Sequence, residues 1–362
     1  MKRIVIGMSG GVDSSVSALL LKRQGYEVIG VFMKNWSETD DNGVCTSTTD
    51  WEDVQQVCAS IDIPCYAVNF EKEYQERVFS YFISEYKKGR TPNPDVLCNR
   101  EIKFKAFLDY AIQLGADYIA TGHFVNRKEE NGKFYLCRGK DSNKDQSYFL
   151  YMLKEHQIKK ALFPVGQLTK QEVREIAEKE GLSTFSKKDS TGICFIGERN
   201  FRTFLQNYLP MQKGEMQTES GKVVGEHIGL CYYTLGQRKG LGIGGCGDGR
   251  SWFVIDKDME RNVLVVSQGD DSSALYHRFI YATDATWITD TPAKEGERFS
   301  CTAKFRYRQP DQEVFVTQIG DELIIEAVEE QRAITPGQSV VLYKDDVCLG
   351  GGIVNKSSKQ AL

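Results

Sequence analysis

Residues suited to phosphate chemistry lie near the start of the chain. The stretch Ser9–Ser15 reads Ser-Gly-Gly-Val-Asp-Ser-Ser and combines glycine with hydroxyl and carboxylate side chains. Glycine lets a phosphate approach the main-chain N–H groups closely, and the N-terminus of a helix favours negative charge. The stretch therefore predicts a phosphate-binding loop.

The spacing excludes two common kinds of phosphate site. A Walker loop needs Gly-x-x-x-x-Gly-Lys-Ser/Thr, and the nearest downstream lysine is Lys22. The dinucleotide fingerprint Gly-x-Gly-x-x-Gly is also missing from this stretch. The stretch instead resembles the PP-loop of ATP pyrophosphatases, which cleave ATP between its α- and β-phosphates. A tight glycine-rich turn without a ligand is the alternative.

Two of the ten cysteines stand in contexts that favour reactivity. Cys98 precedes a predicted helix and has Arg100 and Lys103 nearby, and Cys194 follows Lys187-Lys188. Cationic neighbours and a helix N-terminus lower the pKa of a thiol. The alternative for each is a small buried apolar residue. That structural role is the one predicted for the other eight cysteines: Cys45, Cys58, Cys65, Cys137, Cys231, Cys246, Cys301 and Cys348.

The first half of the chain alternates predicted strands and helices, which position these residues. The predicted strands are Ile4–Ile6, Glu27–Met33, Pro64–Phe70 and Asp117–Thr121. The predicted helices are one ending at Gly25, then Asp50–Ile61, Tyr74–Lys88, Asn99–Leu114, Lys154–Lys160, Lys170–Gly181 and Asn200–Asn207. This pattern predicts an α/β fold with a doubly wound parallel sheet and ligands at the carboxyl ends of its strands.

From about Leu209, glycines, turns and short strands replace the helical patterns. The predicted strands there include Trp252–Asp256, Val263–Val266, Glu313–Ile319 and Glu322–Ala327. We therefore expect three domains. They are a catalytic domain over 1–208, a small, mainly-β central domain over 209–278, and a C-terminal β-barrel over 279–362.

Composition limits the class of protein. The net charge of −4 gives no general attraction to nucleic acid, so such binding needs local basic patches. No apolar stretch reaches membrane-spanning length and no signal-peptide pattern is visible, so we expect a cytoplasmic protein without membrane contact. In that compartment cysteines stay reduced, and no Cys-x-x-Cys or zinc pattern is present, so no protein-bound metal is expected.

Longer motifs make the resemblance specific. The chain resembles the tRNA-specific 2-thiouridylases, which place sulfur on C2 of the wobble uridine of certain tRNAs. The resemblance spans nearly the whole chain. It is carried by residues 7–15, 93–99, 120–123, 144–150, 188–199, 225–229, 232–245 and 304–308.

The resemblance implies an order of chemistry. ATP with Mg²⁺ adenylates the C2 oxygen, and Cys194 delivers sulfur that it receives as a persulfide from a sulfur-relay donor protein. Cys98 then attacks the persulfide or frees sulfide from it, which leaves a Cys98–Cys194 disulfide. Asp95 is the candidate for acid–base help, with capping of the turn as its alternative. The implied ATP-binding residues are Gly7, Met8, Ser9, Gly10, Gly11, Val12, Asp13, Ser14, Met33 and Gly122.

For RNA, the resemblance implies that Asn93, Pro94 and Asp95 meet the target base, which has to leave the stack of the anticodon loop. The implied tRNA-binding residues are His123, Lys144, Asp145, Gln146, Arg306, Tyr307 and Gln338, and the central domain is expected to contact tRNA as well. His123 has a structural role as its alternative. Further phosphate contacts, with solvated surface as the alternative, are possible at 87–90, 103, 105, 159–160 and 238–239.

Two other functions stay open on the residues alone. A PP-loop ligase that adenylates a small carboxylate or urea-type oxygen would not need Cys98 or Cys194. A tRNA-binding module with a degenerate nucleotide site is the other alternative, and the intact Ser9–Ser15 stretch speaks against it.

Overall fold

The computed structural model of the chain describes residues 1–37, 46–188, 201–244 and 247–362. Its N-terminal half is built on a five-stranded parallel sheet with the order β3-β2-β1-β4-β7. The strands are β1 (Arg3–Met8), β2 (Glu27–Lys34), β3 (Cys65–Asn69), β4 (Tyr118–Ala120) and β7 (Ala161–Leu162). The first four lie where the alternating pattern predicts them.

Helices cover both faces of this sheet, as expected for a doubly wound fold. Alternate residues of β1 enter different cores, because side chains along a strand point to opposite faces. Ile4 and Ile6 pack with α1 (Val12–Arg23), α2 (Thr46–Ser60) and α8 (Lys170–Lys179). Val5 packs on the other face with the two long helices described next.

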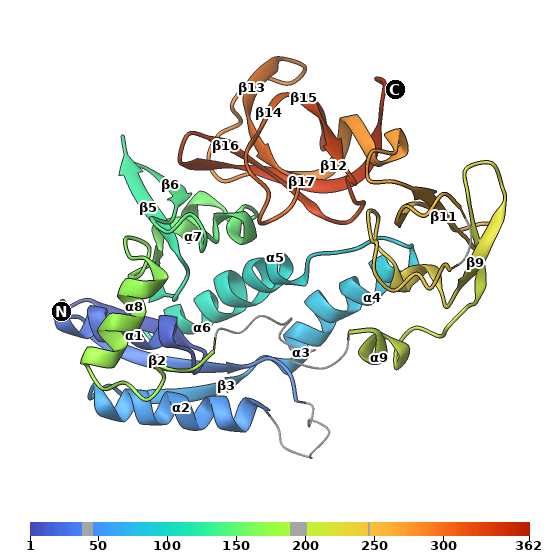
Figure 1. Cartoon of the computed structure of the whole chain (residues 1–362). Helices are drawn as coiled ribbons and strands as arrows, with labels where there is room; N and C mark the ends of the chain where they lie inside the picture. Colours follow the sequence, from blue (N-terminus) through green and yellow to red (C-terminus); the bar gives the residue numbers. More distant parts are fainter. Residues whose placement is uncertain (38–45, 189–200, 245–246) are drawn as a thin grey trace.

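Each of the two long helices contains a π-helical stretch. The first runs through α3 (Glu71–Tyr74), η1 (Gln75–Phe79) and α4 (Ser80–Lys87), and the second runs through α5 (Pro94–Cys98), η2 (Asn99–Ala106) and α6 (Phe107–Gln113). Figure 1 shows these helices between the sheet and the C-terminal barrel. Helix starts at Tyr74 and Asn99 were therefore predicted too late, and the second error changes the setting of Cys98.

The second half is built of β-structure, as expected. A four-stranded sheet of order β10-β11-β8-β9 is followed by a six-stranded barrel of order β12-β15-β14-β13-β16-β17, which β12–β17 pairing closes. The strands of the first sheet are β8 (Gly214–Gln217), β9 (Val223–His227), β10 (Trp252–Asp258) and β11 (Val263–Gln268). The barrel strands are β12 (Tyr276–Trp287), β13 (Arg298–Lys304), β14 (Gln312–Ile319), β15 (Glu322–Arg332), β16 (Ser339–Lys344) and β17 (Val347–Ser358). The predicted fold class is confirmed.

One hairpin joins the two halves and has no counterpart among the predicted elements. It consists of β5 (Val125–Glu130) and β6 (Lys133–Arg138), and β6 pairs with β17 of the barrel. The remaining helices are η3 (Ser147–Leu150), α7 (Glu155–Lys159), α9 (Phe201–Gln206), η4 (Leu230–Tyr232) and η5 (Ser273–Leu275). In the described part of the chain, no helix is long and apolar enough to span a membrane.

Candidate active site

The predicted phosphate loop lies at the carboxyl end of β1 and opens directly into α1. Gly10 has φ +71° and lies against α2, where an added Cβ would come within 2.7 Å of the Asp50 carbonyl oxygen. Gly11 is the N-cap of α1, and no side chain caps the N-terminal N–H groups. Because uncapped N–H groups and the helix dipole attract anions, the loop has the geometry of a phosphate site.

The two loop serines hold each other. The Ser9 N–H donates to Ser14 Oγ at 3.2 Å, and Ser14 Oγ donates to the Gly11 carbonyl oxygen at 3.0 Å. The hydroxyl oxygens of Ser9 and Ser14 also lie 3.2 Å apart. This network fixes the loop without using the N–H groups of the first helical turn.

Met33 and Gly122, the expected adenosine contacts, both lie next to the phosphate loop or the strand that leads into it. A Cβ on Gly7 would lie 2.9 Å from Met33 Cε. A Cβ on Gly122 would lie 2.8 Å from both the Asp13 carbonyl carbon and the Ser14 nitrogen. The ends of β1, β2 and β4 thus converge on one point, the switch point at which open α/β sheets bind ligands.

Sequence reasoning missed a lysine at this loop. Lys170, the first residue of α8, places Nζ 2.7 Å from Asp13 Oδ1, and only 12% of its side chain is exposed. It supplies the cation that the loop lacks in comparison with a Walker loop. Only the packing of α8 against α1 brings it there, so local sequence carries no signal for it.

The Cys98 turn, residues 91–98, differs from the expectation. Helix α5 begins at Pro94, and Asn93 is its N-cap, with Oδ1 accepting from the Asp95 and Val96 N–H groups at 3.2 and 3.4 Å. Cys98 is therefore the fifth residue of the helix, not the residue before it, and its side chain is buried. Asn93 rather than Asp95 caps the turn, which leaves the Asp95 carboxylate available for another role.

Asp95 lies in an electrostatic group with Lys103 and His123. Burial raises the pKa of the Asp95 carboxyl, and the charge of Lys103 opposes this shift. Burial and the same lysine hold the pKa of His123 well below its usual value. The buried His123 ring shares a 2.8 Å hydrogen bond between Nδ1 and Thr121 Oγ1, and its lowered pKa favours the neutral form.

A turn of the barrel holds the Cys98 turn in place. The Thr91 N–H donates to the Pro336 carbonyl at 2.9 Å, and Gln338 Nε2 donates to the Thr91 carbonyl at 2.8 Å. Gly337 has φ +92°, and a Cβ there would come within 2.9 Å of the Thr91 main chain. We call residues 336–338 the barrel clamp.

The other expected tRNA contacts are mostly engaged inside the protein. Asp145 accepts hydrogen bonds from the Gly139 and Ser147 N–H groups and from Ser147 Oγ, and Gln146 Oε1 accepts from the Phe124 N–H. Lys144, which precedes them in the chain, is half-buried.

Arg306 and Tyr307 lie where the barrel meets the other parts of the chain. Arg306 Nη2 donates to the Ala333 carbonyl at 2.8 Å and to the Leu235 carbonyl at 3.4 Å. The Tyr307 ring packs 4.4 Å from that of Phe149, and burial raises its pKa to about 12.

Cys194 lies outside the described residues, so the expected pairing with Cys98 is not tested. Lys187, which we expect to favour its thiolate, forms ion pairs with Asp50 and Asp53 of α2 at 2.7 and 2.5 Å. Burial opposes the charge of Lys187, but hydrogen bonds to both carboxylates raise its pKa. The Lys187 ammonium is thus paired with the carboxylates of α2.

Mg²⁺ fits the loop as a companion of ATP. The described residues contain no group of three or more metal-ligating side chains. Mg²⁺ commonly needs only one or two carboxylates beside substrate phosphates. The half-exposed carboxylate of Asp13, with the hydroxyls of Ser9 and Ser14, would provide that set.

Family models match all three parts of the chain. They are described as tRNA methyl transferase HUP domain over residues 2–198, tRNA methyl transferase PRC-barrel domain over 202–268, and aminomethyltransferase beta-barrel domain over 277–354. The first covers more than half of the chain.

Full-length relatives carry a more specific name, tRNA-specific 2-thiouridylase MnmA. The protein of Alkaliphilus oremlandii is 59% identical over 99% of this chain and 98% of its own length. Those of Halalkalibacterium halodurans and Staphylococcus aureus are 60% and 59% identical, over 99% and 98% of this chain and 96% and 95% of their own lengths. The chain therefore belongs to the tRNA-specific 2-thiouridylase family, as its motifs predict.

Proposed function

We propose that this chain converts the wobble uridine of tRNA into 2-thiouridine at the expense of ATP. The observation that supports this most is the continuity between the phosphate loop and the Cys98 turn. Gly122 packs on Asp13 and Ser14. The next residue is His123, and the charge of Lys103 acts on the pKa of both His123 and Asp95. One base has to meet both an activating nucleotide and a sulfur, so the two sites need to adjoin.

In the first step, the C2 oxygen of the uridine attacks the α-phosphorus of ATP. The bond from that phosphorus to the α–β bridging oxygen breaks, and pyrophosphate leaves with the bonding electrons. The N–H groups of α1, the loop serines and Lys170 stabilise the charge on the departing phosphates. Mg²⁺ held at Asp13 would neutralise part of the same charge.

Asp95 supports this attack as a general base. Its half-buried carboxyl has a raised pKa, which makes the carboxylate a stronger proton acceptor than an exposed one. Removal of the N3 proton of uracil places negative charge on the C2 oxygen, which then attacks phosphorus more readily. Asn93 fixes the position of Asp95 through the N-cap hydrogen bonds.

In the second step, sulfur replaces the activated oxygen. The terminal sulfur of a Cys194 persulfide, supplied by a donor protein, attacks C2, and AMP leaves with the old oxygen. The Cys98 thiolate then attacks the Cys194 sulfur, which releases the thiocarbonyl and forms a disulfide. In the alternative order, Cys98 first releases hydrosulfide, which attacks C2. In either order the Cys98 and Cys194 thiols together lose two electrons and become a disulfide. An external thiol reductant returns these electrons.

The chain is also proposed to divide at 208/209 and 278/279, a few residues after the starts of the second and third matched ranges, 202–268 and 277–354. A reaction that needs reduced thiols suits the cytoplasm, where we expect the protein to work.

The experiment combines the protein with ATP, MgCl₂, unmodified tRNA and either sodium sulfide or a persulfide donor protein. Nucleoside mass spectrometry follows 2-thiouridine, and a coupled assay follows pyrophosphate. We expect both products in the wild type and no 2-thiouridine with Cys194→Ala when the donor is a persulfide.

Three results would contradict the proposal. Pyrophosphate release that does not depend on tRNA indicates a small-molecule ligase. Tight tRNA binding without ATP turnover indicates a binding module. A methylated uridine as the product would indicate a tRNA methyltransferase, the activity named in the family-model descriptions, and not a 2-thiouridylase, the activity named for the full-length relatives.

A further inference from the structure

A basic surface lies at the edge of the sheet opposite the phosphate loop. It consists of Lys2, Arg127, Lys159 and Lys160, which we call the amino-edge surface, because it surrounds the beginning of β4 at Tyr118. The phosphate loop adjoins Gly122, at the other end of the same strand. The surface is thus separate from the active site.

The four cations of this surface have no carboxylate partner within ion-pair distance in the described residues. Lys2 and Arg127 lie over the ring of Tyr118 at 5.0 and 5.7 Å, and Arg127 and Lys159 lie over that of Phe134 at 5.3 and 5.6 Å.

Hydrogen bonds from these cations go to neutral oxygens. Arg127 Nη1 donates to the Lys159 carbonyl at 3.0 Å, and Lys160 Nζ donates to the Asp117 carbonyl at 3.3 Å. The carboxylates of Asp117 and Glu155 instead accept from the Arg3 and Phe134 N–H groups. On a chain with a net charge of −4, this surface gathers four cations that form no ion pair in the described residues.

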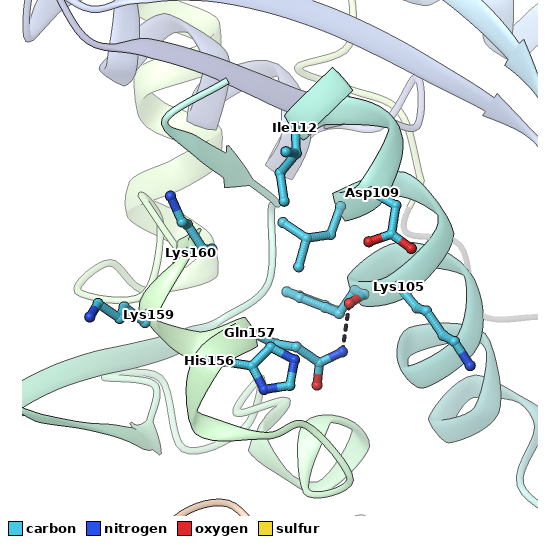
Figure 2. Close-up of a pocket in the computed structure, with 9 residues that line it drawn as sticks. Lys105, Asp109, Ile112, His156, Gln157, Lys159 and Lys160 are labelled. Atoms are coloured by element: carbon cyan, nitrogen blue, oxygen red, sulfur yellow. Dashed lines mark hydrogen bonds between the residues drawn. The ribbon is translucent and has the colours of Figure 1, made fainter. Parts of the chain in front are cut away.

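The amino-edge surface continues into a cavity of about 410 Å³ between η2–α6 and α7. Figure 2 shows Lys159, Lys160 and His156 along one side, with Lys105 and Asp109 along the other. Phe104, Leu108 and Ile112 supply its apolar lining, and Gln157 is fixed by a 2.6 Å hydrogen bond to the Phe104 carbonyl. A cavity of this size accepts a group as large as a nucleotide.

We propose that the amino-edge surface binds the sugar–phosphate backbone of the tRNA substrate outside the anticodon loop, with one nucleotide against the cavity. This inference rests on the proposed function. Phosphates of RNA match a group of cations without ion-pair partners in the described residues, whereas the core of a protein interface needs more apolar area than this surface offers. Of the residues named in this surface and cavity, only Ile112 is a large exposed hydrophobic residue.

The placement fits a contact with the body of the RNA. From Asp95 to Lys105 the helix advances ten residues, or roughly 15 Å at about 1.5 Å per residue. A nucleotide against the cavity wall at Lys105 is therefore not the target base, and we expect the contact to use parts of the tRNA that a short anticodon stem-loop lacks.

The test compares Lys159→Ala/Lys160→Ala with Lys179→Ala/Lys294→Ala. All four lysines are exposed, and both double variants lower the net charge by the same amount. Binding of full-length tRNA and of an anticodon stem-loop is measured over a range of KCl concentrations, together with 2-thiouridine formation on both RNAs.

For the Lys159/Lys160 variant we expect full-length tRNA to bind about tenfold more weakly at low salt. The slope of log K against log salt should fall by about 1.5, because each lost phosphate contact removes about 0.7 to 0.9. Binding of the stem-loop and thiolation of the stem-loop should not change. The Lys179→Ala/Lys294→Ala control should match the wild type in every measurement.

Unchanged affinity and slope for full-length tRNA would overturn the proposal. So would a loss confined to sulfur transfer from a donor protein with sulfide-driven thiolation intact, since the surface would then bind that protein. Absence of 2-thiouridine on both RNAs in the wild type would instead refute the proposed function.

Discussion

The phosphate loop and the Cys98 turn adjoin, yet they are fixed in different ways. Hydrogen bonds between Ser9 and Ser14 fix the conformation of the loop within the first strand–helix unit. The Cys98 turn depends on the barrel clamp, which belongs to the other end of the chain. Binding of the ATP phosphates should therefore survive changes in the barrel, whereas the steps that use the Cys98 turn, base activation by Asp95 and sulfur transfer, should not.

Removing the Cys98 thiol should separate the two halves of the reaction most completely. Cys98→Ala leaves the loop contacts untouched, so tRNA-dependent pyrophosphate release should persist for the first turnover. Formation of 2-thiouridine should fall by at least about a thousandfold, as for other groups that form covalent bonds in a reaction. Nucleoside mass spectrometry and a pyrophosphate assay measure the two steps. Retained thiolation would remove Cys98 from the mechanism.

Lys170→Ala should have the converse effect. Loss of a cation beside the departing phosphates should slow pyrophosphate release by about a hundredfold and weaken ATP binding, measured by calorimetry. Lys22→Ala is the matched control, because Lys22 lies on the last turn of α1 and pairs with exposed Asp62. Equal rates in the two variants would mean that Lys170 only anchors α8.

Asp95→Asn should lower the rate of adenylation by about a hundredfold, since the general base is lost. The fall of that rate at acidic pH, which reports protonation of Asp95, should also disappear. The same change should stabilise the fold at neutral pH. The folded-state pKa of Asp95 is raised, so its contribution is most favourable at low pH and is lost as the pH rises through that pKa. Urea denaturation at pH 4 and pH 7 measures this, and a stability gain larger at pH 4 would contradict it.

Gly337→Ala should weaken the clamp and slow thiolation by about tenfold while the affinity for ATP stays within about twofold. The new Cβ would press on the Thr91 main chain and also carry the cost of a positive φ, together about 2 kcal/mol of unfolding free energy. Gly296→Ala is the control, because it has φ +78° and nothing within 4 Å of an added Cβ. Similar thiolation rates in both variants would show that the clamp is irrelevant to sulfur transfer.

Gln338→Ala tests the clamp most gently. It removes one hydrogen bond to the Thr91 carbonyl, worth about 1 kcal/mol, so thiolation should slow only about two- to fivefold. A Gln338→Glu variant keeps the size but loses the donor and should behave like the alanine variant. If Gln338→Glu retained full activity, the hydrogen bond would not matter.

The loop was predictable because its signals are local. Glycine, serine and aspartate follow a buried strand directly, and the structure shows the predicted turn into a helix. The start of α5 was missed although its signal is local too, since Asn93 followed by Pro94 is a typical N-cap and first helical position. The β5–β6 hairpin was missed as well, although Asn131-Gly132 is a typical hairpin turn, and both residues have positive φ in the structure.

Long-range contacts were not predictable in this way. Lys170 reaches Asp13 across 157 positions, and Gln338 reaches Thr91 across 247. No periodicity or propensity specifies such a meeting, because it follows from how finished elements pack. The engagement of Asp145 and His123 with their neighbours is likewise a property of the packed core.

The pairing of β6 with β17 has a consequence for the order of folding. The strand that pairs with the hairpin at Val347–Cys348 also closes the barrel by pairing with β12. Because a strand without its partner presents an unpaired edge, the edge of β6 stays open until β17 is in place. The placement of this one strand therefore protects both the barrel and the catalytic half of the chain against edge-to-edge pairing.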